Sequence, residues 1–304
     1  MYCAELSILL HRALEARMEI LMNNLSVADW QGQPDDLHEV RVASRRVRAV
    51  LDLVEPGLYP GFKRQGRKLK GLTRALGRSR EMDVHIAILE DLGRQAPGLA
   101  SGSAMEHALE VIEEHRRKAL KSMARDLAEL NLKHLPQLLE VPSLPDPFRA
   151  GDLLGAVWDC LEPSLRVAFP AAALLDQEDA RALHLLRIRV KRLRYTLEVL
   201  GAAFPTPPER QLGHLKALQT ALGDHHDRAM LQDHLDDLYR GLETRNRPVL
   251  AAGTLEILAQ LGEERLIAFE QFRALAVAMP KDQFIDSLRR DLGLEPEPEG
   301  NSHP

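Results

Sequence analysis

Two stretches of the chain carry a histidine followed by cationic side chains three, seven, eight and ten positions later. The first stretch contains His38, Arg41, Arg45, Arg46 and Arg48, and the second, 146 positions later, contains His184, Arg187, Lys191, Arg192 and Arg194. At about 100° per residue, positions 0, 3, 7 and 10 of an α-helix fall within a stripe roughly 80° wide. Each stretch therefore predicts a helix with one cationic face. Its chemistry suits phosphate, because the planar guanidinium group binds pairs of oxygen atoms.

The segment after the first stretch adds a second cationic stripe. It consists of Lys63, Arg67, Lys70, Arg74 and Arg78. In the second half only Lys216 holds a matching place, because Thr220 and Asp224 stand where the two later arginines would be. We therefore expect a shared pocket to be more positive on the side of the first half.

Pure cationic stripes are unusual on solvated helices, since like charges at i, i+4 oppose a helix by about 0.2–0.5 kcal/mol per pair. An anionic ligand is the simplest compensation, and pairing with acidic residues elsewhere in the fold is the alternative. No Gly-rich nucleotide loop is present, and cations spread over four helices favour an extended anion. Stacking aromatics are nearly absent from the basic segments, which makes nucleic acid a weaker candidate than an inorganic phosphate chain.

The composition predicts an all-α protein. Of the 304 residues, 45% are hydrophobic and only 4% aromatic, and runs of β-branched residues are scarce. Two distant cysteines, Cys3 and Cys160, form no disulfide framework or zinc motif. No apolar stretch has the length of a membrane span and no secretion signal is recognisable, so we expect a soluble, cytoplasmic protein that does not contact membranes.

Helical periodicity predicts four segments in each half of the chain. In the first half the segments are residues 6–24, the first histidine helix, residues 62–92 with a break at Gly77, and residues 105–139. The first histidine helix is expected to be capped by Asp35 or Asp36 and to end at Glu55-Pro56-Gly57. In the second half the segments cover 153–169, interrupted at Pro163, then 180–200, 209–240 and 248–278. The proline-rich segment 141–148 separates the halves, and the tail 295–304 is expected to be disordered.

The halves align without a gap from His38 to Leu92 at the constant offset of 146, which indicates an internal duplication. The identities include Ala75-Leu76-Gly77 with Ala221-Leu222-Gly223. We predict two similar four-helix bundles, residues 5–140 and 150–280 of one domain over 5–290, related by a pseudo-two-fold axis around a basic channel. Tyr195 has no counterpart and is predicted to pack in the core.

The pattern H-x-x-R-x-x-x-R/K-R-x-R, found twice, together with LGRSREMDV at 76–84 and LGDHHDRAM at 222–230, resembles the conserved histidine α-helical domain (CHAD) family. The resemblance implies two four-helix bundles around a channel that binds inorganic polyphosphate without catalysis, cofactor or metal, often on or near polyphosphate granules. Carried over position by position, it assigns to the channel His38, Arg41, Arg45, Arg48, His184, Arg187, Lys191 and Arg194, joined by Lys70 and Lys216. Glu81 departs from the family pattern, which has aspartate there.

Two other functions compete with this prediction. His225, His226 and Asp227, with His184 upstream and Asp233 downstream, are loosely similar to the ligands of His-Asp metal phosphohydrolases. This cluster is not duplicated, and it lies beside cations that would repel a metal. The second alternative is a scaffold for nucleic acid or protein.

Overall fold

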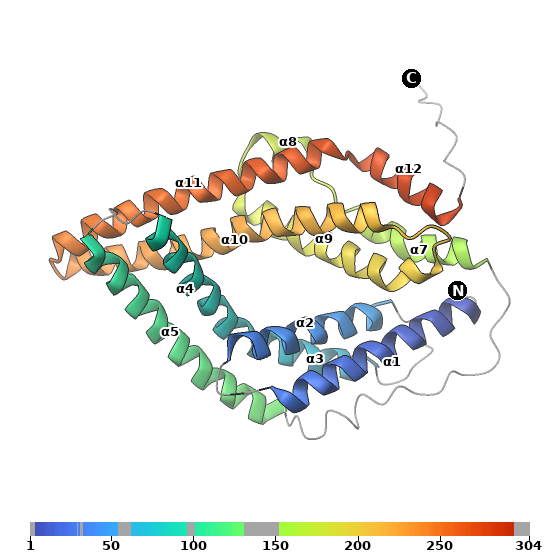
Figure 1. Ribbon diagram of the computed structural model, residues 1–304, viewed down its shortest axis with the longest axis horizontal. Helices are drawn as coiled ribbons and strands as arrows, with labels where there is room; N and C mark the ends of the chain where they lie inside the picture. Colours follow the sequence, from blue (N-terminus) through green and yellow to red (C-terminus); the bar gives the residue numbers. More distant parts are fainter. Residues whose placement is uncertain are drawn as a thin grey trace.

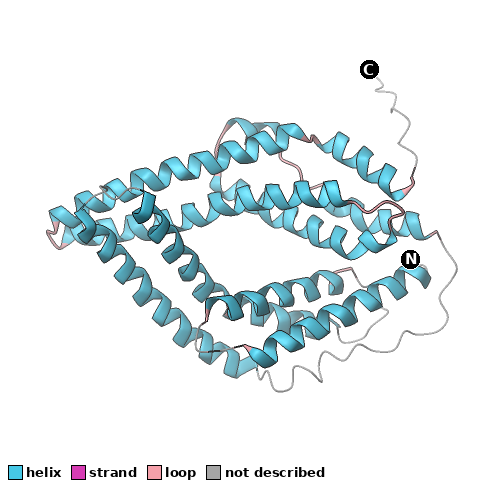
Figure 2. Cartoon of the chain, in the orientation of Figure 1, coloured by secondary structure: helices cyan, strands magenta, loops and turns pink. Residues whose placement is uncertain are grey.

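The computed structural model describes residues 4–28, 30, 33–53, 62–95, 101–130 and 152–294, without the side chains of 62–65, 95 and 101. The described residues form helices joined by turns and loops, and no strand occurs among them (Figures 1 and 2). The all-α prediction is therefore confirmed. None of the helices in the described part of the chain is long and apolar enough to cross a membrane.

The first half contains α1 (Ala4–Val27), α2 (Pro34–Leu51), α3 (Phe62–Ala75), α4 (Gly77–Gln95) and α5 (Ser101–Leu130). The break expected at Gly77 is confirmed, because Leu76 separates α3 from α4. The predicted cap of α2 is wrong. The helix begins earlier, at Pro34, so Asp35 and Asp36 lie inside its first turn, where the helix dipole still favours carboxylates.

The second half contains α7 (Leu153–Leu165), α8 (Ala172–Asp176), α9 (Ala180–Leu200), the short 3-10 helix η2 (Gly201–Ala203), α10 (Glu209–Thr244), α11 (Pro248–Ala278) and α12 (Lys281–Leu292). The second histidine helix, α9, has its predicted bounds. It begins where the Asp179 carboxylate accepts the backbone N–H groups of Arg181 and Ala182, at 2.9 and 3.0 Å. Pro163 lies inside α7 rather than interrupting it.

The halves differ at their aligned glycines. α3 and α4 are separated just before Gly77, whereas α10 runs through the matching Gly223 as one 36-residue helix. At its far end α10 pairs with α11, and α4 and α5 of the first half pack against this pair (Figure 1). α2 and α9 contact each other across the middle of the molecule.

The buried hydrophobic side chains form two clusters, and each draws on both halves. The larger contains Leu6 and Val47 from the first half and Leu193 from the second. The smaller joins Leu89 of α4 to Leu231 of α10 at the end where α4, α5, α10 and α11 meet. The halves therefore share their cores, which fixes α2 opposite α9.

Several predictions fall outside the described residues. They are the proline-rich boundary at 141–148, the disordered tail at 295–304, and any role for the side chains of Cys3 and Lys63. The predicted end of the first histidine helix at Glu55-Pro56-Gly57 is wrong, because α2 already ends at Leu51, with Asp52 and Leu53 in a turn. The internal duplication and the division into halves at 5–140 and 150–280 stay predictions from the sequence.

Candidate anion-binding site

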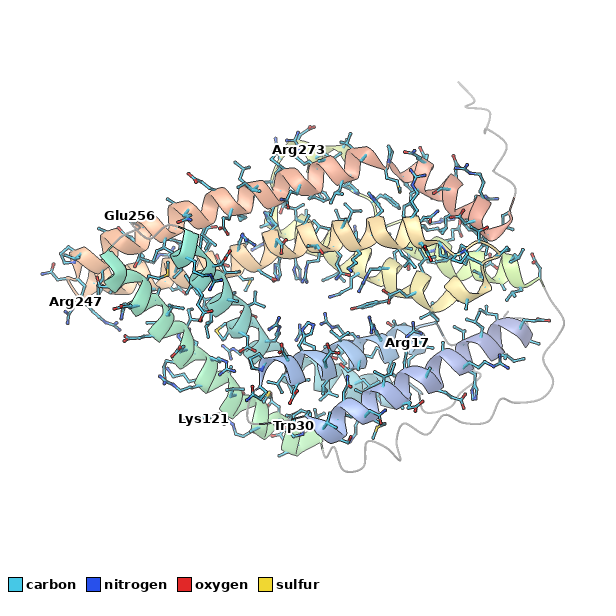
Figure 3. All side chains as sticks on the ribbon, viewed as in Figure 1. Arg17, Trp30, Lys121, Arg247, Glu256 and Arg273 are labelled. Carbon is cyan, nitrogen blue, oxygen red and sulfur yellow. The ribbon has the colours of Figure 1, made fainter. Side chains whose placement is uncertain are left out.

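The cationic faces of α2 and α9 point toward each other and line two adjoining cavities, which share Arg41 and Arg45. Side chains from both helices extend into the space between them in Figure 3. The first cavity, of about 310 Å³, is also lined by Arg48, Ala49, Asp52, Leu53, Thr73, Ile188, Lys191, Arg192, Tyr195 and Thr196. The second, of about 220 Å³, is also lined by His38, Gly77, Arg80, Glu81, Val84, His85, Arg187, His226, Asp227 and Met230.

The apolar faces of the same helices explain this orientation. Val40 and Val47 on α2 and Leu193 on α9 are completely buried in the larger hydrophobic cluster. Because apolar and cationic positions lie on opposite sides of each helix, burying the first set turns the second toward the partner helix. The hydrophobic effect thus brings together groups that repel one another.

Both halves place the first arginine of the motif over a glycine. A Cβ atom added to Gly77 would lie 2.9 Å from Arg41 Nη1, and one added to Gly223 would lie 3.5 Å from Arg187 Nε. Arg41 Nη1 also donates a hydrogen bond to the Thr73 carbonyl at 3.1 Å. The aligned glycines therefore position the arginines, a role that the sequence indicated only as a repeated Leu-Gly pair.

The cations at the centre of the site form no direct ion pair, although Asp52, Glu81 and Asp227 line the same cavities. In the described part of the chain, Arg41, Arg45, Arg187 and Lys191 form no ion pair, and Arg187 Nε is buried without a hydrogen-bond partner. Arg194 does pair with Glu198, at 3.2 Å. Pairing with acidic residues, the alternative to an anionic ligand, therefore accounts for Arg194 but not for the central cations.

Burial and mutual repulsion lower the pKa values of these groups. Burial, followed by the charges of Arg45, Arg187 and Arg80, lowers the pKa of Arg41 to about 10. Burial, followed by the charges of Arg45, Arg187, Arg41 and Arg194, lowers the pKa of Lys191 to about 7. The free site thus destabilises its own positive charge, and a bound anion would relieve this repulsion.

The motif histidines are less basic than usual. Burial lowers the pKa of His38, with Arg80 as the next cause, and burial lowers that of His184, with Arg187 next. His38 lines the second cavity, whereas His184 lies behind it with its Nδ1 atom 3.2 Å from Nδ1 of His226. Both would therefore contribute hydrogen bonds rather than charge at neutral pH.

The remaining predicted residues lie elsewhere. Arg46, Arg67, Lys70 and Arg74 are exposed and line neither cavity. Arg78 lines a separate cavity of about 490 Å³ beside α5, with His115, Lys118 and Arg125. Lys216 lines a shallow groove between α10 and α11. The structure thus brings together the two histidine helices but not the stripe of α3, whose cationic face points outward.

Several residues of the site were not predicted for it, among them Arg80, His226 and Tyr195. Arg80 and His226 line the second cavity and are aligned with each other at the offset of 146, so the repeat offered a signal for both. Tyr195 is only 8% exposed, as expected of a core residue. It nevertheless lines the first cavity, and the Arg194 guanidinium carbon lies 4.8 Å from the centre of its ring.

The cluster predicted for a metal phosphohydrolase comes together only in part. His184 and His226 lie side by side, with their Nδ1 atoms 3.2 Å apart, and Asp227 lines the same cavity as His226. His225 is instead 1% exposed, and its Nε2 atom lies 2.6 Å from a carboxylate oxygen of Glu178. In the described part of the chain, the side chains arranged to hold a metal are a different group, Glu81, His85 and His234.

The fold and the site define an all-α protein with two opposed histidine-arginine helices around a basic cavity. Residues 12–236 match the model of the CHAD domain family, and the chain belongs to this family. It is 28% identical over 241 residues to two uncharacterized proteins of Mycobacterium tuberculosis, MT2285 and Rv2226. The alignment includes 74% of this chain but only 44% of the length of each relative.

Two solved structures share the fold. PptA from Streptomyces chartreusis has a TM-score of 0.64 at 17% identity, over 88% of this chain and 97% of that chain. The CHAD domain of the plant Ricinus communis has a TM-score of 0.58 at 23% identity, over 94% of this chain and 91% of that chain.

Proposed function

We propose that the protein binds inorganic polyphosphate, without catalysis, in the two adjoining cavities between α2 and α9. The observation that carries this proposal is the convergence of Arg41, Arg45, Arg187 and Lys191 without an ion pair among the described residues. Membership in the CHAD domain family supports it. Guanidinium groups from two facing helices suit the closely spaced oxygens of a phosphate chain.

The shape and lining of the site favour a chain of phosphates over nucleic acid. The two cavities join through Arg41 and Arg45, so an elongated anion can extend from one into the other. Among the described residues that line the two cavities, Tyr195 is the only Phe, Tyr or Trp. Proteins that bind single strands use aromatic platforms for successive bases, and a phosphate chain needs none.

The test compares polyphosphate binding by the wild type, Arg41→Ala and Arg187→Ala, with Arg67→Ala as an exposed control outside both cavities. Hydrogen bonds to charged groups contribute about 1.5–3 kcal/mol, so each cavity variant should bind about 10- to 100-fold more weakly, while the control should bind as the wild type does. Circular dichroism checks that the helices persist. Equal loss in the control would contradict a localised site.

Two further measurements separate the alternatives. Affinity should fall steeply with salt, because each neutralised phosphate releases counterions. RNA or DNA that displaces labelled polyphosphate at equal phosphate concentration would favour a nucleic-acid scaffold. Release of orthophosphate by the purified protein would instead favour the phosphohydrolase.

The same proposal places the protein in the cytoplasm, on or near polyphosphate granules. A fluorescent fusion of the wild type should concentrate at granules, and a fusion carrying both Arg41→Ala and Arg187→Ala should stay diffuse. Equal recruitment of both fusions would mean that another surface directs localisation.

A further inference from the structure

His85 on α4 is a buried histidine without polar partners. Its side chain is 1% exposed, and both of its ring nitrogens are buried without a hydrogen bond. A neutral imidazole carries one N–H donor and one acceptor, and leaving either buried and unpaired is unfavourable. Its aligned position in the second half holds Leu231, so the motif does not require a histidine there.

Two further metal-ligating side chains surround His85. Glu81 lies four residues earlier on α4 and therefore on the same face of the helix. His234 approaches from α10, with its ring centre 5.1 Å from that of His85. One ligand atom from each of the three residues lies within 4.8 Å of the others.

The hydrogen bond of His234 prepares its other nitrogen for a metal. Nδ1 of His234 lies 2.9 Å from the Met230 carbonyl oxygen. A carbonyl can only accept, so Nδ1 carries the proton and Nε2 keeps its lone pair. Ligating histidines commonly have this arrangement, in which one nitrogen donates to a backbone carbonyl and the other binds the metal.

We propose that Glu81, His85 and His234 form a binding site for a divalent transition metal ion of the zinc class. Two imidazole nitrogens and one carboxylate are a ligand set that zinc uses with a fourth position left open. With bonds of about 2.0–2.2 Å, tetrahedral ligands lie about 3.4 Å apart, so side-chain rotation would have to bring the ligand atoms closer by up to about 1.4 Å. The proposal does not rest on polyphosphate binding, but Glu81 and His85 border the second of the cavities proposed for it.

Two of the three residues border the second cavity, because Glu81 and His85 also line it. The open position therefore faces this cavity, where water or a ligand oxygen completes the shell.

The test uses the full chain, stripped of metal by a chelator and kept free of polyphosphate. Zn²⁺ is titrated by calorimetry, and Co²⁺ by its visible absorption. The wild type should bind one equivalent, with the spectrum of a tetrahedral or five-coordinate nitrogen and oxygen site, and Zn²⁺ should raise its Tm. Absence of saturable one-to-one binding by the wild type would overturn the proposal.

Variants locate the ion. Glu81→Gln and His234→Gln should lower affinity at least about tenfold, since changes even outside a ligand set cost about 10- to 100-fold. His107→Gln is the matched control, because His107 pairs with Glu110 on the surface of α5 at 3.8 Å. Metal binding that survives unchanged in both ligand variants would refute the assignment.

His85→Leu tests the same site without depending on a polar replacement. It installs the residue found at the aligned position of the second half, so the packed core should persist. The metal-free variant should have a higher Tm than the metal-free wild type, because an unpaired buried group is removed. It should also show no rise in Tm with Zn²⁺, and a rise equal to that of the wild type would contradict the proposal.

Discussion

The pKa of Lys191 makes polyphosphate affinity depend on pH. Burial and four surrounding arginines lower this pKa from 10.5 to about 7 in the free protein. A bound phosphate chain stabilises the ammonium form and raises the pKa toward its ordinary value. The free site must then take up a proton when it binds above pH 7, so affinity is highest below pH 7 and falls as pH rises.

The magnitude follows from linkage between proton and anion binding. If the pKa of Lys191 returns to 10.5 in the complex, affinity falls about 50-fold between pH 7 and pH 9, or about 2.3 kcal/mol. A bound-state pKa of about 9 still gives about 25-fold. At pH 8 about 0.9 proton is taken up per site.

Titration calorimetry in two buffers of different ionisation enthalpy measures both the affinity and the proton uptake. The ligand should be a long phosphate chain, because the titratable end groups are then few compared with the other phosphates and disturb the measured pH dependence least. Lys191→Met retains most of the side-chain stem and should abolish the slope, whereas Lys216→Met, on the shallow groove outside the cavities, should keep it. Affinity that changes less than about twofold from pH 7 to 9, or a slope that survives in Lys191→Met, would refute the reasoning.

The same linkage acts on folding. The folded free protein binds fewer protons at Lys191 than the unfolded chain between pH 7 and 10.5, so this residue makes the free energy of unfolding rise with pH across that window. Below pH 7 the charged form carries the full penalty. Thermal unfolding of Lys191→Met should therefore lack this part of the pH dependence.

Two more predictions concern the positions of the helices and their arginines. Gly77→Ala places a Cβ 2.9 Å from Arg41 Nη1, against 3.5 Å from Arg187 Nε for Gly223→Ala, so the first should weaken polyphosphate binding several-fold more than the second. Both variants should have an unchanged or higher Tm, since alanine favours a helix over glycine by about 1 kcal/mol. Equal losses of polyphosphate affinity in the two variants would show that the contact with Arg41 is unimportant. Asp179→Ala removes the cap of α9. This variant should lower the free energy of unfolding by about 1 kcal/mol in urea titrations. An unchanged midpoint of the urea unfolding curve would mean that the cap contributes nothing.

Strong periodicity and local signals at both ends let the sequence predict the second histidine helix, α9, whereas the predicted cap and end of α2 were wrong. The bounds of α9 were predicted to the residue, with Asp179 before the helix and Gly201 after it. The Leu-Gly pair was less informative. It breaks the first half at Leu76 yet lies inside α10 in the second, because a glycine is tolerated within a helix when tertiary packing holds both sides.

Helical periodicity also could not give the direction of the stripe on α3. A wheel diagram shows that Arg67, Lys70 and Arg74 share a face, but packing of the opposite face decides where that face points. Leu69 and Leu72 are completely buried, so the cations of α3 point outward. The sequence also carried no sign that His85 and His234 lie together. His234 is far from His85 in the sequence, on α10, and the aligned position in the first half holds Ile88.

This placement changes the meaning of the charge asymmetry between the halves. The surplus of cations in the first half lies largely on the exposed face of α3, while α2 and α9 contribute comparable sets to the cavities. The inequality that remains is local. Arg80 lines the second cavity opposite its aligned residue His226, whose pKa is lowered to about 4 by burial and then by His184 and Arg187. α4 contributes Arg80 and Glu81 to this lining, and α10 contributes Asp227 and the neutral imidazole of His226. α4 therefore supplies one guanidinium that α10 lacks, so a phosphate chain in the second cavity should lie nearer α4 than α10.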